Sequence, residues 1–180
     1  STAHGADSIN DLKCEYIANP IAIDTAKPRL SWILKSNDSN RRGLKQTAYQ
    51  ILVSSSLSNL NNNNGDLWDT GKHSSDQSIQ IEYNGSALSA EKDCFWKVRI
   101  WNENDVATAW SAPAQWKMGL ITSADWDAAK WIRHSDGSSQ VSPLLRNEFK
   151  VRKTIKSAYA YICGLGYYEM YLNGSKVGDH

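Results

Sequence analysis

The sequence predicts an all-β protein built around an antiparallel sandwich. Its apolar residues are of types that favour strands, since the 180 residues include eight Trp and eight Tyr but only two Phe and two Met. Short segments in which apolar and polar residues alternate follow one another without helices of the usual length between them. Turn-forming pairs such as Asn84-Gly85 separate these segments. Short strands at this spacing are typical of an antiparallel sandwich.

Seven strands are expected in residues 1–119. The third shows the pattern clearly, because Tyr49, Ile51 and Val53 share one face. Residues 54–66 contain four consecutive Asn and predict a long polar loop. The expected strands lie within residues 12–16, 30–34, 49–53, 67–71, 79–83, 94–101 and 114–118, the last of them preceded by Trp110, Ser111 and Pro113.

Residues 120–134 have a different pattern. They suggest one helical turn followed by extended chain. Trp126 and Trp131 are poor residues to leave in water, so this segment is interpreted as a linker that packs.

Residues 135–180 predict the start of a second β domain. Strands are expected around 145–151, 158–162 and 168–172, and a fourth begins near Lys176. The pair Asn173-Gly174 is the strongest hairpin signal in the chain. Four strands of which the last is cut short cannot close a sandwich, so edges and an apolar face would stay open. The chain is therefore expected to be a fragment, or to complete itself against another chain through the open edge of 135–180.

Composition excludes several classes of function. A net charge of +1 argues against a nucleic-acid binder, and no apolar stretch approaches the roughly 20 residues that span a bilayer. The three Cys fit neither a disulfide framework nor a zinc motif, although Cys14 and Cys94 could bridge if both point into one core. The chain starts with Ser rather than Met and shows no leader, which is either absent or already removed.

No catalytic, cofactor-binding or metal-binding residue is expected. The close acidic pairs lie in predicted turns, where carboxylates cap and are solvated; they are Asp66 with Asp69, Glu103 with Asp105, and Asp125 with Asp127. The histidines are scattered through polar loops and termini, at His4, His73, His134 and His180. No strained nucleophile turn accompanies them. Gly164-Leu165-Gly166 lacks a third glycine and opens a strand, so it predicts no phosphate loop.

Sugar-binding residues stay unknown at this stage. Several aromatic rings fall opposite the expected core and could stack on sugars, namely Phe95, Trp101, Tyr167 and Tyr171. Contact with a neighbouring domain is the favoured explanation of these rings. Neither Asn173 nor Asp179 is assigned a sugar or calcium role. Three Asn-x-Ser sequons occur, at Asn37, Asn84 and Asn173, and the last two are explained by turns.

The first domain resembles a fibronectin type III module. Trp32 fits the buried Trp of the second strand of that module, and 49–53 fits its third strand. Leu88 followed by 96–100 fits its loop and sixth strand. The tyrosine that usually starts the sixth strand is replaced by Cys94, so its hydrogen bond must be missing or supplied otherwise.

The order of the motifs resembles the N-terminal region of bacterial α-L-rhamnosidases, over nearly all of residues 10–180. The motifs are LKCEY at 12–16, NPI at 19–21, PRLSW at 28–32, QTAYQI at 46–51, LWDTGK at 67–72, FWKVRIW at 95–101, Trp126 with Trp131-Ile132, LLRNEF at 144–149, GLGYYEMYLNG at 164–174 and VGD at 177–179. The resemblance implies a fibronectin-like sandwich (1–119), a packed linker (120–134) and the first strands of a truncated jelly roll (135–180). It reaches none of the catalytic (α/α)6 barrel.

The family's reaction, as the resemblance implies, is inverting hydrolysis of terminal α-L-rhamnose. Inversion needs an acid and a base carboxyl group, which in this family lie in the barrel, and no position here matches them. The chain is thus expected to be a non-catalytic accessory region, with the rest of the enzyme as its partner and rhamnose-containing glycans reached only through the parent enzyme. Two alternatives stay open: a stand-alone carbohydrate-binding module and a fibronectin-like protein-interaction module. The compartment is undecided, with a periplasmic or secreted location favoured.

Overall fold

The computed structural model describes residues 8–36, 43–127, 129–133 and 143–178. The chain divides into two compact units, Ser1–Ala129 and Lys130–His180, and each is described by itself. Strands and turns dominate the described residues, so the prediction of an all-β fold is confirmed.

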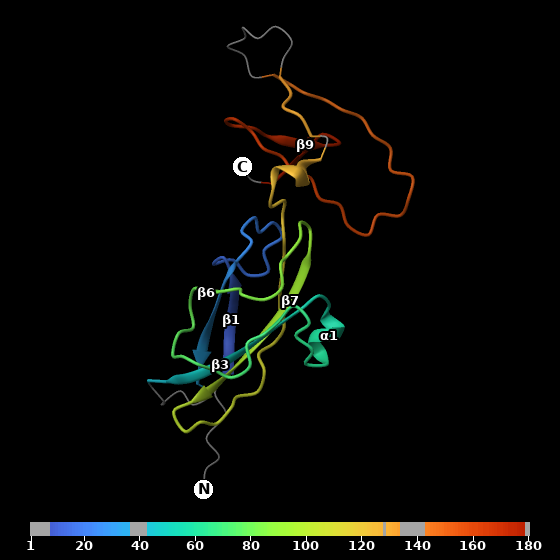
Figure 1. Ribbon diagram of the computed structural model, residues 1–180. Coiled ribbons are helices and arrows are strands. Elements are labelled where there is room, and N and C mark those ends of the chain that lie inside the picture. The colour runs from blue at the N-terminus through green and yellow to red at the C-terminus, as the bar shows by residue number, and fades with distance from the viewer. Residues whose placement is uncertain (1–7, 37–42, 128, 134–142, 179–180) are drawn as a thin grey trace. The chain divides into compact units, whose positions relative to one another are not determined.

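Two antiparallel sheets form the first unit (Figure 1). The smaller sheet has the order β1-β2-β6, with β1 at Ser8–Cys14, β2 at Arg29–Lys35 and β6 at Ile81–Glu82. The larger sheet has the order β4-β3-β7-β8, with β4 at Trp68–Asp69, β3 at Gln46–Ser54, β7 at Asp93–Asn102 and β8 at Ala114–Lys117. A short strand β5, at His73–Ser74, also pairs with β3.

The core lies between these sheets because the strands alternate as the sequence predicts. In the register of β3 and β7, Ile51 lies opposite Val98 and Val53 lies opposite Trp96, and all four side chains are buried. Burial of this apolar surface is the main stabilising contribution to the unit.

Trp32 on β2 is buried in this core, as predicted. Its indole Nε1 donates a hydrogen bond to Oε1 of Gln46 over 3.0 Å, and its ring meets Tyr49 edge-on at 5.3 Å between centroids. The amide of Gln46 in turn donates to the carbonyls of Ser75 and Gln77. The buried amide of Gln46 therefore provides a hydrogen-bond acceptor for the indole N–H of Trp32 and fixes the chain between β5 and β6.

The region expected to be a polar loop, 54–66, contains a helix, so that prediction is wrong over five residues. Helix α1 spans Leu57–Asn61, and the side chain of Ser56 accepts a hydrogen bond from the backbone N–H of Asn59 as its cap. Leu60 is fully buried. The run of asparagines predicts a loop, but the buried side chain of Leu60 fixes this helical turn to the rest of the unit.

The strand expected over 79–83 is shorter than predicted, because it is paired only at Ile81–Glu82, and the one expected over 12–16 ends at Cys14. The last strand, expected through Trp116 and Met118, forms at Ala114–Lys117. Beyond β6, the backbone N–H of the buried Tyr83 donates to the carbonyl of Pro28, and its hydroxyl donates to the carbonyls of Leu67 and Ser86. The side-chain hydrogen bonds hold the loop where the strand ends.

Cys94 fills the core position where the resemblance calls for a tyrosine. Both Cys94 and Cys14 are buried in the same hydrophobic cluster, and both thiols are free. Burial raises the pKa of each thiol to about 12. The two cysteines thus point into one core, as expected of a pair that could bridge, but they are not bridged.

After β8 the chain forms one short 3-10 turn, η1, at Ser123–Trp126. Asp125 caps it, because its carboxylate accepts from the backbone N–H groups of Ile121 and Thr122. Trp126 is half-buried and Trp131 is exposed.

Over its described residues, the second unit forms one hairpin, of β9 (Met170–Leu172) and β10 (Ser175–Val177). Asn173 and Gly174 form its turn with φ values of 49° and 83°, so the hairpin prediction is confirmed. The strands expected around 145–151 and 158–162 are not formed in the described residues. A strand needs a hydrogen-bonded neighbour. The hairpin has one, because its two strands pair with each other.

Candidate functional site

The acidic residues singled out in the sequence are engaged in turns. Asp66 accepts from the backbone N–H of Ser55 over 2.9 Å and from the hydroxyl of the same residue. Burial acts to raise the pKa of Asp66, but hydrogen bonds, mainly from Ser55, outweigh it and lower the pKa. Asp69 accepts from the side chain of Gln50 and from the backbone N–H of Gly71, each over 2.8 Å. Both carboxylates hold the chain around α1 and β4.

The other two pairs also serve local structure. Asp125 caps η1, and the backbone hydrogen bonds from Thr122 and Ile121 lower its pKa. Asp127 has a positive φ of 49° directly after that turn. Asp105 forms an ion pair with Lys72. Glu103 also has an interaction partner.

The one described histidine packs against an aromatic ring. The ring of His73 lies 5.0 Å from that of Tyr49, tilted by 44°. His4, His134 and His180 lie outside the described residues, as does Asp179. Within the described ranges, no group of three or more His, Cys, Asp or Glu could hold a metal ion. Nor is any described helix long and apolar enough to cross a membrane.

Cations cover Trp101, the ring considered for sugar stacking. The Nζ of Lys72 lies 5.1 Å and the Cζ of Arg99 lies 5.0 Å from its centroid. Trp101 is half-buried on β7. These cation–π contacts occupy stacking positions that a sugar ring would need.

Arg99 extends this arrangement to a second indole. Its Cζ lies 4.7 Å from the ring centroid of Trp110, and the Nζ of Lys97 lies 5.1 Å from the same centroid. The Oε1 of Gln50 accepts from Nε and Nη2 of Arg99, over 2.9 and 2.7 Å. We call this set the aromatic ladder; its members are Lys72, Lys97, Arg99, Trp101 and Trp110.

The sequence signals part of the aromatic ladder. Lys97, Arg99 and Trp101 recur at every second position of one expected strand, so their common face can be read from the pattern. Trp110 is expected before the last strand, and it does lie before β8, where its ring meets Arg99. No pattern in the sequence predicts such a contact between a strand and the loop that follows it.

The remaining aromatic candidates have no common site. Phe95 is half-buried on β7, opposite Gln115 of β8. Tyr167 and Tyr171 are exposed in the second unit. The hydroxyl of Tyr171 donates to Glu169 over 2.9 Å, and Glu169 also pairs with Lys176 over 2.7 Å. Asn173 occupies a turn, Asn84 lies in irregular chain after β6, and Asn37 lies outside the described residues.

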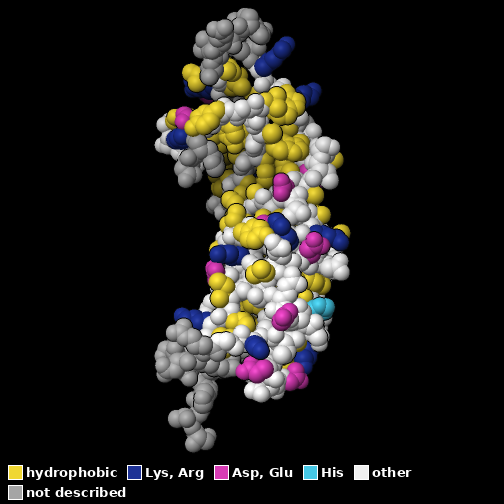
Figure 2. Space-filling view, turned by 90° about the vertical axis from the view of Figure 1, so that its left-hand side faces the viewer, with side chains coloured by type: hydrophobic (Ala, Val, Ile, Leu, Met, Phe, Trp, Pro, Cys, Tyr) yellow, Lys and Arg dark blue, Asp and Glu magenta, His cyan; other side chains and the backbone are white. Residues whose placement is uncertain are grey.

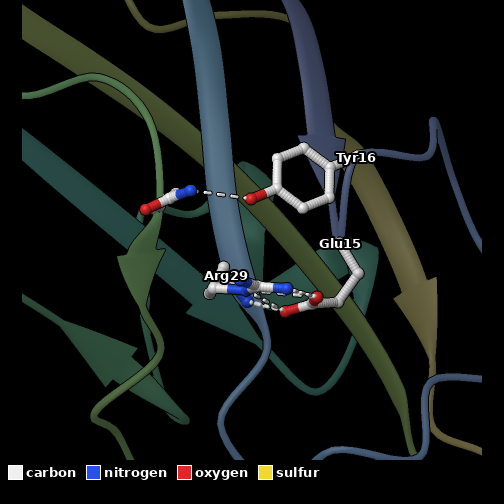
Figure 3. A network of polar contacts seen from close by, with 4 residues as sticks. Glu15, Tyr16 and Arg29 are labelled. Carbon is white, nitrogen blue, oxygen red and sulfur yellow. Dashed lines mark hydrogen bonds and ion pairs between the residues drawn. The ribbon is translucent and has the colours of Figure 1, made fainter.

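A network that the sequence does not single out links β1, β2 and the segment before β6 (Figure 3). Glu15 accepts from Nε and Nη2 of Arg29, over distances of 2.6 to 3.2 Å, and from the backbone N–H of Arg29 over 2.6 Å. The guanidinium Cζ of Arg29 lies 5.1 Å from the ring centroid of Tyr16. The hydroxyl of Tyr16 accepts from Nε2 of Gln80 over 2.8 Å, and Figure 3 shows it directed at that amide.

This network lies at backbone positions that few residues adopt. Glu15, Tyr16 and Gln80 all have positive φ values, of 47°, 67° and 55°. The hydrogen bonds from Arg29 are the largest cause of the lowered pKa of Glu15. In the sequence, Glu15 and Tyr16 are neighbours and Arg29 stands apart from them. Neither feature predicts that the side chain of Arg29 contacts the other two.

The fold and these surfaces define an immunoglobulin-like β-sandwich followed by a smaller unit that contains a hairpin. Residues 9–122 match the family model described as "Rha78A-like, N-terminal immunoglobulin domain". Residues 153–180 match the family model described as "Alpha-L-rhamnosidase N-terminal domain". The chain belongs to the α-L-rhamnosidase family and corresponds to its N-terminal region.

Curated relatives agree with this assignment. Proteins named α-L-rhamnosidase from Formosa agariphila and from Alteromonas sp. (strain LOR) are each 37% identical, over 91% of this chain. The chain spans 19% and 18% of their lengths.

Solved structures show the same likeness. The α-L-rhamnosidase from Dictyoglumus thermophilum is 42% identical with a TM-score of 0.63, over 67% of this chain and 13% of that one. The Streptomyces avermitilis α-L-rhamnosidase, solved in complex with L-rhamnose, is 38% identical with a TM-score of 0.62, over 68% of this chain and 12% of that one.

Proposed function

We propose that this chain is the non-catalytic N-terminal accessory region of an α-L-rhamnosidase that hydrolyses terminal α-L-rhamnose from glycans or glycosides. The observation that carries the proposal is coverage: relatives with this name match 91% of the chain, while the chain spans less than a fifth of each. The remaining four fifths of such a protein would hold the acid and base carboxyl groups that inversion requires.

The roles of the acidic residues support this proposal. Asp66 and Asp69 hold turns, Asp105 pairs with a lysine of the aromatic ladder, and Asp125 caps η1. A general acid needs a raised pKa, and the pKa values of Asp66 and Asp125 are lowered instead.

The second unit supports a partner in the same polypeptide. We propose that residues 135–180 begin a jelly-roll domain that further strands of the parent enzyme complete. Figure 2 shows hydrophobic side chains gathered on the surface of this unit. The exposed large apolar side chains of the unit include Leu144, Leu145, Phe149, Val151, Ile155, Leu165, Tyr167, Leu172 and Val177. So much exposed apolar surface on one small unit is typical of an interface.

The proposal is tested by assaying the purified 180-residue chain and the parent enzyme on an aryl α-L-rhamnoside. We expect hydrolysis by the parent and none above buffer by the chain. Measurable hydrolysis by the chain would refute a non-catalytic role. The same preparation is titrated calorimetrically with L-rhamnose up to millimolar concentration. We expect no heat, because cations occupy stacking positions on Trp101; a saturable signal would favour a carbohydrate-binding module.

A further inference from the structure

Exposed apolar side chains concentrate around the Glu15–Arg29 network of the first unit. Tyr16, Ile17, Ile21 and Ile79 are between 56% and 62% exposed. They come from two segments, and the hydrogen bond between Tyr16 and Gln80 joins these segments. We call these four residues the Tyr16 surface. Ile33 lies further along β2 from Arg29, whereas the other exposed large apolar residues described in the sandwich, Leu57 and Val106, come singly from separate segments.

The Tyr16 surface is held rigidly before any partner arrives. Arg29 lies over the Tyr16 ring, Glu15 holds the guanidinium through two nitrogens, and Gln80 fixes the hydroxyl. An ordered aromatic ring loses little side-chain entropy when it is buried. Pre-ordered tyrosine and arginine side chains with isoleucines around them are the composition of interface centres.

The chemistry of the partner follows from the charges. The carboxylate of Glu15 neutralises Arg29, so the network presents no unpaired charge of its own. The partner segment should therefore offer apolar side chains, with neutral hydrogen-bonding groups opposite Tyr16 and Gln80. An anionic partner would lose hydration here without gaining an ion pair, because Arg29 is already paired with Glu15.

We propose that the Tyr16 surface is the docking site for a segment of the parent rhamnosidase that lies beyond these 180 residues. The proposal rests on the proposed function, because that function supplies the parent chain. About four fifths of each curated relative has no counterpart in this chain. The polypeptide in that remaining part is the largest partner available to an exposed apolar surface. Because it belongs to the same chain, its effective concentration at this surface is high.

The test places a photoreactive residue in the full-length parent enzyme. Ile17 is replaced by p-benzoylphenylalanine, and the irradiated protein is digested and sequenced by mass spectrometry. We expect cross-links from position 17 to peptides beyond residue 180. Val106 is the matched control, because it is 58% exposed like Ile17 but lies outside the Tyr16 surface. The same probe at Val106 should give these cross-links in severalfold lower yield.

Other outcomes overturn the proposal. Cross-links only to residues 1–180, only to a second copy of the protein, or to nothing would each exclude a docked segment. Hydrogen exchange in the unmodified parent gives an independent readout. Peptides covering 15–21 and 78–82 should exchange more slowly in the parent than in the 180-residue chain, and equal rates would contradict docking. Rhamnosidase activity of the parent reports on the proposed function separately.

Discussion

At the scale of single residues, the aromatic ladder shows how one arginine can organise a sheet face. Arg99 lies against two indoles and uses two of its nitrogens on Gln50. Its neighbour Lys97 is buried, and desolvation lowers the pKa of that lysine. A planar, delocalised cation suits the position of Arg99 better than an ammonium group, because it stacks and donates a fork of hydrogen bonds at once.

Arg99→Lys should therefore destabilise the first unit by about 1–2 kcal/mol, since it loses the stacking and the paired hydrogen bonds while keeping the charge. Urea unfolding of the 180-residue chain followed by tryptophan fluorescence measures this change. The exposed Arg152→Lys is the control and should change stability by less than about 0.5 kcal/mol. Equal effects of the two substitutions would show that the ladder contributes no stability.

Glu15 makes stability depend on acid pH. Hydrogen bonds from Arg29 hold its folded-state pKa below the ordinary value of 4.5. This contribution is complete above the unfolded-state pKa and is lost as the pH falls through the lower folded-state pKa. Glu15→Gln should cost about 1–2 kcal/mol at pH 7 and less as the pH drops through that range.

Urea titrations at several pH values measure the Glu15 effect. Glu148→Gln is a matched control, because Glu148 pairs with Arg146 in a highly exposed setting and should contribute little at any pH. A cost for Glu15→Gln that is constant down to strongly acid pH would contradict the assigned role.

The three thiols should react at very different rates. Cys14 and Cys94 are buried with pKa values of about 12, so little reactive thiolate is present and reagents cannot reach it. Cys163 is exposed. With an aromatic disulfide reagent at pH 8, one thiol should react rapidly in the folded chain and all three in denaturant. Rapid reaction of two or more thiols in the folded chain would contradict the burial described here.

At the scale of elements, alternation predicts the strands that pair with a neighbour in this chain. The faces of β3 and β7 are predicted correctly because both strands lie in the middle of a sheet whose inner face is buried. Alternation cannot report whether a partner strand is present, so 145–151 and 158–162 are predicted as strands that the structure lacks. Helix α1 escapes prediction because five residues are too few to show a helical period.

The β9–β10 hairpin depends on its turn residues. Gly174 has φ of 83°, so Gly174→Ala forces a side chain into left-handed backbone and should cost about 1 kcal/mol. Gly166→Ala is the matched control, since an added Cβ also meets nothing within 4 Å there but φ is not left-handed. Amide exchange of residues 170–177 by NMR should accelerate about fivefold for Gly174→Ala alone. Unchanged exchange would mean that the turn does not determine hairpin stability.

At the scale of the whole molecule, the family could be predicted from the sequence, whereas the contacts that form the Tyr16 surface could not. Ordered motifs such as PRLSW and LWDTGK identify a family even when each motif is short. The Tyr16 surface depends on the contact between Tyr16 and Gln80, which are 64 positions apart, and no pattern within a strand encodes that contact. Proposals about partners therefore rest on the exposed side chains rather than on motifs.

The isolated 180-residue chain should self-associate. Within the described residues, β9 and β10 pair only with each other, so their outer edges can template further strands. Sedimentation velocity should show a dimer whose fraction grows with concentration. The shorter chain 1–129, which contains the whole sandwich core, should stay monomeric. A strictly monomeric 180-residue chain at high concentration would rule out association through this edge.

The way in which the polypeptide leaves the sandwich has a mechanical consequence. The backbone N–H of Gly119 donates to the carbonyl of Ile23 over 2.7 Å, and the N–H of Ile23 donates to the carbonyl of Lys117 over 3.0 Å. The N–H of Lys117 in turn donates to the carbonyl of Pro20 over 2.9 Å. A Cβ at position 119 would come within 3.3 Å of the Ala22 backbone. A force applied to the chain after Gly119 therefore loads these three hydrogen bonds together in shear, so that they do not break one after another. The exit from the sandwich should therefore act as a stiff anchor, which extends to Ile121 because that side chain packs against the same core.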